Sequence, residues 1–350
     1  MFLALKEILF NKKRFSLIIF LVVLISYLVY FLTSLAYGLA SSYTNGMNKT
    51  EAKYILLDND SNDNVMMSIL TFDNFSEVTS TKKAKLGIFP GVASKANKES
   101  KLDVYLFGID DFDFFLPKEN IQIMSGNEVI VDTKFEEEGY KIGDEIVLSG
   151  SDIKLTIKGF AKKATYQTAP IIYLNLDTWN NYRYGVNKEI YNMIVIKDTP
   201  VINEGSNLKV YKNSEYYQTL PGYSAQVLTF SMMIIFLILI ASFVLGVFIY
   251  VLTIQKTSIF GVMKAQGIAN SYISRSVVAQ TLIITIFGTV IGFILTFISG
   301  VFLGGKIPFA ANPLFYGVIS LVFYLFALMS SLFSVNAVVK IDALKAIGEV

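Results

Sequence analysis

Four long apolar runs constrain the fold of this chain more than any other feature. They cover residues 15–39, 223–254, 276–305 and 307–339 and contain no Asp, Glu, Lys or Arg. A helix of about 20 residues crosses the roughly 30 Å hydrocarbon core of a bilayer. The composition agrees, because 53% hydrophobic residues and a mean hydropathy of +0.51 are too apolar for a soluble protein. The sequence predicts transmembrane helices at 15–40, 223–254, 276–305 and 307–339.

The first run has an alternative, because Gly38-Leu39-Ala40 followed by Ser41 could be a signal-peptidase site. The apolar run is about twice as long as the usual core of a signal peptide, however. We therefore expect it to remain as the first membrane helix.

The basic residues predict the orientation of the helices, since cytoplasmic loops are enriched in Lys and Arg. They cluster before the first run and between the second and third runs, at Lys6, Lys12, Lys13, Arg14, Lys256, Lys264 and Arg275. The sequence thus predicts a cytoplasmic interfacial helix at 1–14, a cytoplasmic coupling segment at 255–275 and a cytoplasmic tail at 340–350. Residues 41–222 form an extracytoplasmic domain, and the turn at Lys306 lies outside. We expect a multi-pass protein of a bacterial cell membrane with both termini in the cytoplasm.

The extracytoplasmic segment reads as a mixed α/β domain. Ile153, Leu155 and Ile157 alternate with polar residues, which predicts a strand with one buried face, and Gly150-Ser151-Asp152 supplies the turn of a hairpin. Residues 129–131, "APIIYLN" and "YNMIVIK" are further expected strands. Short helices are expected after Asp132, ending at Gly139, and over residues 177–184, ending at Gly185. Residues 61–101 show no clear order.

Candidate chemistry in this domain is sparse. The chain has no Cys and no His, which excludes disulfides, His/Cys zinc sites and His- or Cys-based catalytic triads. Asp110, Asp111 and Asp113 lack the spacing of a calcium loop and are interpreted as a solvated turn. Glu136, Glu137 and Glu138 are interpreted as the wet face of a short helix. We predict no catalytic residue and no metal site.

Two amphipathic segments flank the membrane helices. At the start, Phe2, Leu5 and Leu9 share one helical face, so residues 1–14 should lie along the inner membrane surface; extension of the first membrane helix is the alternative. In the connector, a helix over 257–267 places Ile259, Val262 and Met263 on one face, with Phe260 at its edge, and Gly267 ends it. Such a helix could dock into a partner's groove, although an interfacial helix without a partner would have the same pattern.

Four motifs give the chain a resemblance to the FtsX/MacB-type permeases of ABC transporters. They are "LALKEILFNKKRF", "NEVIVDTKFEEEGYKIGDEIVLSG", "TIQKTSIFGVMKAQGIANSYI" and "KIDALKAIG", and the resemblance covers nearly the full chain. The chain looks most similar to the permeases of bacterial haem-export systems. The resemblance implies a homodimer that works with two copies of an ABC ATPase subunit, because this chain has no Walker nucleotide-binding motif.

The resemblance also implies the roles of particular residues. Carried over by position, the helix that docks on the ATPase contains Phe260, Gly261, Met263, Lys264, Ala265 and Gly267. ATP-driven closure of the ATPases would move the outside domains through this helix, a mechanotransmission cycle. Gln266 departs from relatives, which often carry an aliphatic or small residue there.

Haem is the expected cargo, carried and not permanently bound as a cofactor. Without His or Cys, its iron would need Tyr, Met, Glu or Lys as an axial ligand. Candidate contacts are Tyr37, Tyr43, Met47, Glu51, Lys163, Tyr166, Tyr223, Phe230 and Met233. Tyr37 and Tyr43 could instead be interfacial belt residues, and Met233 could serve packing.

Other functions of the same family stay open. One is a signal transmitter of the cell-division FtsX type, which activates a cell-wall hydrolase without transport; others are export of antimicrobial peptides or drugs, and lipoprotein release. A secondary transporter is disfavoured because the apolar runs contain no charge. Gly288 and Gly292 predict close helix packing. A net charge of +2 gives no indication of nucleic-acid binding, and the expected partners are the bilayer, the ATPase, a second copy of the chain, and haem or another amphipathic small molecule.

Overall fold

The structure is a computed structural model and describes residues 2–95, 101–117, 126–185, 189–303 and 307–339. It divides into two compact units, one formed by residues 1–38 and 229–350 and the other by residues 39–228. Each unit has its own core. The predicted cytoplasmic tail, including the "KIDALKAIG" motif, and the predicted outer turn at Lys306 lie outside the described residues.

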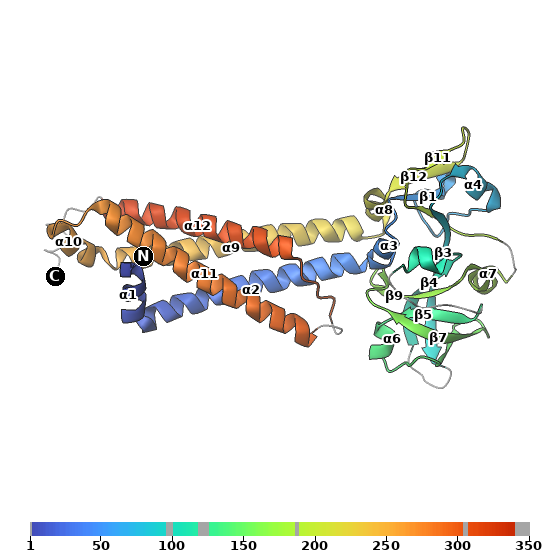
Figure 1. Ribbon diagram of the computed structural model, residues 1–350, viewed down its shortest axis with the longest axis horizontal. Helices are drawn as coiled ribbons and strands as arrows, with labels where there is room; N and C mark the ends of the chain where they lie inside the picture. The colour runs from blue at the N-terminus through green and yellow to red at the C-terminus, as the bar shows by residue number, and fades with distance from the viewer. Residues whose placement is uncertain (1, 96–100, 118–125, 186–188, 304–306, 340–350) are drawn as a thin grey trace. The chain divides into compact units, whose positions relative to one another are not determined.

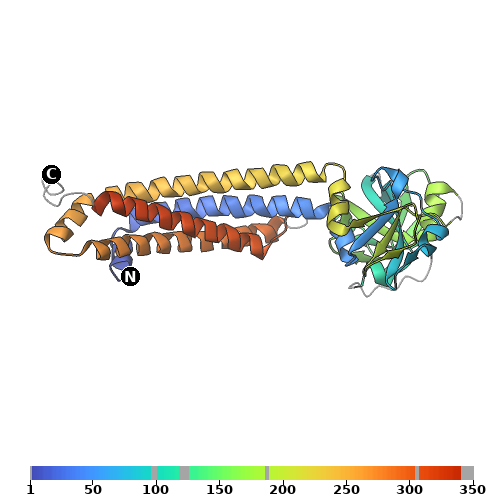
Figure 2. The same cartoon turned by 90° about the horizontal axis from the view of Figure 1, so that it is seen from above.

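The first unit, here called the membrane unit, is helical. Its elements are α1 (Phe2–Phe10), α2 (Lys12–Ser42), α9 (Tyr223–Ile254), α10 (Thr257–Ala265), α11 (Asn270–Leu303) and α12 (Pro313–Val339). Four of these helices, α2, α9, α11 and α12, are long and apolar enough to cross a membrane. The four-helix fold class predicted from the sequence is confirmed. Both views show the four long helices side by side, with α1 and α10 at the same end of the bundle (Figures 1 and 2).

Helices α2 and α11 pack closely because α11 presents glycines to α2. A Cβ atom on Gly288 would lie 2.4 Å from a methyl carbon of Val22, and one on Gly292 would lie 2.1 Å from the Ser26 hydroxyl. Ser26 also donates a hydrogen bond to the Gly288 carbonyl at 3.2 Å. The close packing predicted for this small-residue pair is therefore confirmed, and larger residues would force the two helices apart.

The second unit, here called the outer unit, is a mixed α/β domain. Its strands are β1 (Tyr54–Asp58), β2 (Val78–Thr79), β3 (Lys83–Lys95), β4 (Lys101–Ile109), β5 (Glu128–Asp132), β6 (Glu145–Leu148), β7 (Lys154–Ala161), β8 (Thr165–Tyr166), β9 (Ala169–Asn175), β10 (Met193–Ile196), β11 (Val201–Ile202) and β12 (Leu208–Lys212). Its helices are α3 (Asn45–Lys49), η1 (Asn59–Ser61), α4 (Phe72–Ser76), α5 (Phe112–Phe115), α6 (Lys134–Glu137), α7 (Leu176–Tyr184) and α8 (Asn213–Thr219).

One large sheet organises the outer unit. Its strand order is β12-β1-β10-β3-β4-β9-β5-β7-β6, and β8 pairs with β9. The far end of β3 also pairs with β6, at Ala93–Lys95, so the path from β3 through β4, β9, β5, β7 and β6 returns to β3. The β6–β7 hairpin predicted at residues 150–152 is confirmed, and Leu155 and Ile157 of β7 are buried as expected.

Successive residues of the central strands enter two separate cores, since side chains alternate across a strand. Leu106 belongs to one core and its neighbour Phe107 to the other; the same holds for Ile172 and Tyr173. Both faces of the sheet centre are therefore covered, and this explains why these strands are apolar on both sides.

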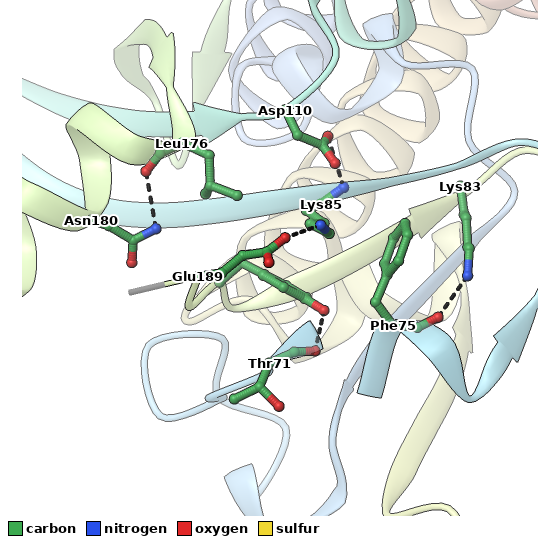
Figure 3. A network of polar contacts seen from close by, with 9 residues as sticks. Thr71, Phe75, Lys83, Lys85, Asp110, Leu176, Asn180 and Glu189 are labelled. Carbon is green, nitrogen blue, oxygen red and sulfur yellow. Dashed lines mark hydrogen bonds and ion pairs between the residues drawn. The ribbon is translucent and has the colours of Figure 1, made fainter. Parts of the chain in front are cut away.

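Strand β3 occupies part of the region in which the sequence showed no order. Its Gly87, together with Gly108 of β4, accommodates the ring system of Trp179 on α7: a Cβ on either glycine would lie within 2.6 Å of a Trp179 atom. At the start of β3, the Lys85 ammonium pairs with Glu189 and its backbone N–H donates to Asp110 at 3.0 Å (Figure 3). Glycines that look like turn signals in the sequence are thus packing positions within a strand.

Candidate functional site

The connector between α9 and α11 contains a regular helix with a defined end. Gly267 has φ +83°, which favours glycine, and its N–H donates to the Lys264 carbonyl at 2.9 Å. The N–H of Ile268 donates to the Met263 carbonyl at 3.0 Å, which completes a Schellman motif. The prediction that Gly267 ends this helix is confirmed.

The two faces of α10 differ from the predicted arrangement. Phe260 is only 5% exposed and packs with Ile273, Val277 and Val335 of α11 and α12. Ile259 and Val262 are 54% and 46% exposed. The large ring of Phe260, predicted at the edge, therefore faces the bundle because it can bury the most apolar area there.

The residues assigned to ATPase coupling consequently fall into two groups. Phe260 and Gly261 are buried and hold the helix in place, Met263 and Lys264 are half-buried, and Ala265 and Gly267 are exposed. The exposed part, with Ile259 and Val262, is an apolar surface bordered by the half-buried Lys264, and such a surface can dock on another protein or on lipid.

A buried polar cluster lies directly before α10. Lys256 is 4% exposed, its ammonium pairs with Glu7 of α1 at 2.5 Å, and it donates to Gln280 of α11 at 2.8 Å. It also lies 4.9 Å from the centre of the Phe15 ring of α2. We call Lys256, Glu7, Gln280 and Phe15 the basal node. Sequence reasoning missed it, since it treated Lys256 only as a topology signal.

In the outer unit the structure brings Tyr43 and Tyr223 together. Their ring centroids are 5.8 Å apart, and the Tyr223 ring lies 6.3 Å from that of Tyr217. The Tyr217 hydroxyl donates to Asn48 Oδ1 at 2.6 Å. Tyr43 and Tyr223 are half-buried, so both keep accessible ring surface.

Two other predicted cargo contacts are core residues of the outer unit. Met47 and Tyr166 are fully buried. The Tyr166 hydroxyl lies 2.7 Å from that of Tyr216, and its ring packs edge-on against Tyr105 and Phe107. Burial raises the pKa of Tyr166, which disfavours the phenolate that iron would bind. In this conformation neither side chain offers a surface to a cargo.

Lys163 and Glu51 are exposed and adopt left-handed backbone conformations, with φ of 54° and 56°. Lys163 lines a pocket of about 260 Å³ together with Lys49, Lys162, Asn45 and Asn48. Three lysines around one pocket favour an anionic group such as a carboxylate or phosphate.

A second and larger cleft lies in the outer unit. Its volume is about 600 Å³, within the range of small-molecule sites. Its walls include Met66, Pro90, Tyr105, Gln167 and Pro221. The cleft is mixed in character, with amide groups beside aromatic and apolar surface.

The remaining cargo candidates belong to the membrane unit. The Tyr37 ring packs edge-on against Phe315 with centroids 5.4 Å apart. Phe230 is half-buried, and Met233 is 39% exposed. Their role in cargo binding stays a prediction.

The acidic cluster of the outer unit has a structural role. Asp110 accepts the Lys85 N–H, and Asp111 Oδ1 accepts the Phe114 N–H at 2.9 Å, capping α5. Within the described ranges, no group of three or more acidic residues is arranged to hold a metal ion. Glu136, Glu137 and Glu138 are all exposed, as predicted for a wet helix face.

Comparison with known proteins finds a matching domain and full-length relatives. Residues 231–343 match the FtsX-like permease C-terminal domain. Over 351 residues, and 99% of both chains, the sequence is 27% identical to a Staphylococcus epidermidis protein described as "Putative hemin transport system permease protein HrtB". A protein of the same description from Staphylococcus haemolyticus is 25% identical over 357 residues, again with 99% of both chains covered.

A solved structure was also matched, the extracellular domain of the noncanonical ABC-type transporter YknZ from Gram-positive bacteria. It is 12% identical, with a TM-score of 0.28, and covers 42% of this chain and 83% of that chain. Four apolar helices and the match of residues 231–343, which contain the α10 helix, identify a membrane-embedded protein. Residues 231–343 are thus similar to an FtsX-like permease C-terminal domain, and the chain is similar along its whole length to proteins described as hemin transport system permeases.

Proposed function

We propose that this permease, together with an ABC ATPase, removes haem or another amphipathic toxicant from the membrane by mechanotransmission. The observation that carries the proposal is similarity to hemin transport permeases over 99% of both chains, which covers the outer unit as well as the membrane helices. A general FtsX-like function would require similarity only in the C-terminal domain. The active form is a homodimer with two ATPase subunits, and both termini are cytoplasmic.

Three features of the structure support a role for α10 as the contact with the ATPase. The helix is fixed at its end by the Schellman motif, anchored by Phe260 and exposed at Ile259 and Val262. A rigid helix with an exposed apolar side transmits a displacement, whereas a flexible loop would absorb it. The ATPase would therefore act on α9 and α11 through α10.

Haem without His or Cys ligands suits the residues near the start of α9. Tyr43 and Tyr223 lie side by side with accessible rings, which can stack on a porphyrin, and a tyrosine oxygen can bind ferric iron. Lys162 and Lys163 line a pocket that suits carboxylates. Haem is thus the proposed cargo, and Tyr43 and Tyr223 are its proposed contacts in the outer unit.

The proposal is tested by deleting the gene and challenging cells with haemin and, separately, with a cationic antimicrobial peptide. We expect haemin sensitivity that the wild-type gene restores. Unchanged haemin tolerance in the deletion strain would contradict the assignment of haem as the cargo, and sensitivity to the peptide alone would favour peptide export. A defect in cell separation without either sensitivity would favour the signal transmitter of the cell-division type.

Docking is tested with Lys264→Glu, which reverses the half-buried charge beside the exposed part of α10. We expect the ATPase to co-purify with the wild-type permease and much less with the variant, because the ATPase groove would have to accept a carboxylate. Lys13→Glu, an exposed charge reversal on α2, is the matched control. Equal recovery of the ATPase with both variants would contradict docking through α10.

A further inference from the structure

The basal node is the meeting point of four helices of the membrane unit. Lys256 immediately precedes α10, and its carbonyl accepts the Phe260 N–H at 3.0 Å. Its ammonium contacts Glu7 of α1 and Gln280 of α11, and it lies over the Phe15 ring of α2. Any displacement of α10 that moves Lys256 therefore acts on α1, α2 and α11 together.

The charges of the node are not an incidental surface pair. Glu7 is the sole acidic residue in residues 1–38 and 229–339, and it faces a lysine that is 4% exposed. A lysine that served only as a topology signal would keep its ammonium in water, because burying a charge is costly unless it is paired. Lys13, which is exposed, shows that the same end of the bundle can leave a lysine solvated.

The surroundings of the node leave room for rearrangement. A cavity of about 20 Å³ is lined by Lys256 and Gln280 together with Thr253, Thr281 and Thr285. The rest of its lining is apolar and includes Ile18 and Leu245, and its volume is about that of one water molecule. Close-packed apolar contacts would resist small shifts, whereas an ion pair beside a small cavity can keep its partners while the helices move.

We propose that Lys256 is a positioning residue that couples α10 to the first membrane helix through Glu7. When the ATPase moves α10, the ion pair carries α1 and the adjoining α2 with it, and Gln280 does the same for α11. This inference rests on the proposed docking of an ATPase on α10. It adds a second route to the outer unit, since α2 leads into that unit directly and α9 is the other connection along the chain.

The experiment compares ATPase association with ATPase-driven work in the same complexes. The variants are Glu7→Gln, Lys256→Gln, the charge swap Glu7→Lys/Lys256→Glu, and Lys13→Gln as the matched control. The permease and the ABC subunit that co-purifies with it are reconstituted in liposomes loaded with haemin. The quantity measured is haemin released to an external acceptor protein per ATP hydrolysed.

Each single node variant should retain the ATPase, because the exposed part of α10 is untouched, yet lower the haemin released per ATP by about tenfold, a typical size for coupling between sites. The charge swap should recover most of the loss, and Lys13→Gln should match the wild type. A purely structural role would lower the amount of folded complex without changing the ratio in what remains.

Three results would overturn the inference. Normal haemin release per ATP in Glu7→Gln would show that the Glu7 carboxylate does not couple α10 to α1. This variant also tests the node if Lys256→Gln fails to fold. A charge swap no better than the single variants would show that the ion pair is not the connection. Loss of ATPase association in Glu7→Gln would assign α1 to docking. The docking proposal is tested separately by Lys264→Glu. If that variant keeps the ATPase, docking through α10 is contradicted, whereas the results above contradict only the coupling through Glu7.

Discussion

Tyr166 gives a sharp test of the outer unit, because the sequence analysis predicts a cargo contact at this residue whereas the structure places it in the core. Its hydroxyl is fully buried and lies 2.7 Å from that of Tyr216. Tyr166→Phe would leave the Tyr216 hydroxyl without this partner at a cost of about 1–3 kcal/mol. For a domain of this size, each kcal/mol lowers Tm by about 2–4 °C, so we expect a drop of a few degrees.

The double variant Tyr166→Phe/Tyr216→Phe should be closer to the wild type than Tyr166→Phe alone. It removes both hydroxyls, so no buried polar group is left unsatisfied, and such paired replacements can be nearly neutral. The assay is thermal unfolding of the full chain in detergent, followed by fluorescence. The chain has one tryptophan, Trp179, and it lies in the core of the outer unit, so its emission reports on that unit alone.

Haemin binding by the same variants decides between the two roles. We expect Tyr166→Phe to keep the haemin affinity of the wild type and Tyr43→Ala to weaken it, since of these two residues Tyr43 alone has accessible ring surface. Unchanged Tm together with lost haemin binding in Tyr166→Phe would refute the core assignment. It would mean that the outer unit opens to expose Tyr166 when cargo is bound.

Two further predictions concern the stability of the outer unit. Gly108→Ala would place a Cβ 2.4 Å from the Trp179 side chain, so we expect a loss of about 1–3 kcal/mol from overpacking and a shifted emission, whereas Gly91→Ala, with its nearest contact at 3.5 Å, should change neither. The ammonium of Lys95 lowers the pKa of Asp144, so this pair stabilises the fold above the ordinary carboxyl pKa and stops doing so as pH falls through the lowered value. Asp144→Asn should therefore reduce the fall in Tm between about pH 5 and about pH 2. An unaltered fall would show that protonation of Asp144 does not contribute to the loss of stability in acid.

Much of this architecture follows from local sequence patterns. The membrane helices are long uncharged runs, and the β6–β7 hairpin and α7 carry their own turn and capping residues. These signals are local, so a single sequence is enough to find them. Strand β3 is different: Gly87, Pro90 and Gly91 look like a turn, and only packing against Trp179, some 90 residues later in the chain, explains Gly87 in a strand.

The candidate sites show the same division. Gly267 could be predicted to end α10 because the Schellman motif is local. The basal node could not, since Glu7, Lys256 and Gln280 come from distant segments and Lys256 resembles any cytoplasmic lysine. Tyr166 is a candidate cargo contact by residue type, whereas its burial depends on the arrangement of the whole sheet.

The most direct test of the central claim is haemin transfer by the reconstituted complex of permease and ATPase. Liposomes that contain the complex and haemin are mixed with an acceptor protein, and transfer is measured with ATP and with a non-hydrolysable analogue. We predict that ATP hydrolysis accelerates transfer and that Lys264→Glu abolishes the acceleration. A wild-type complex that hydrolyses ATP but transfers no haemin would contradict the proposal that the protein exports haem.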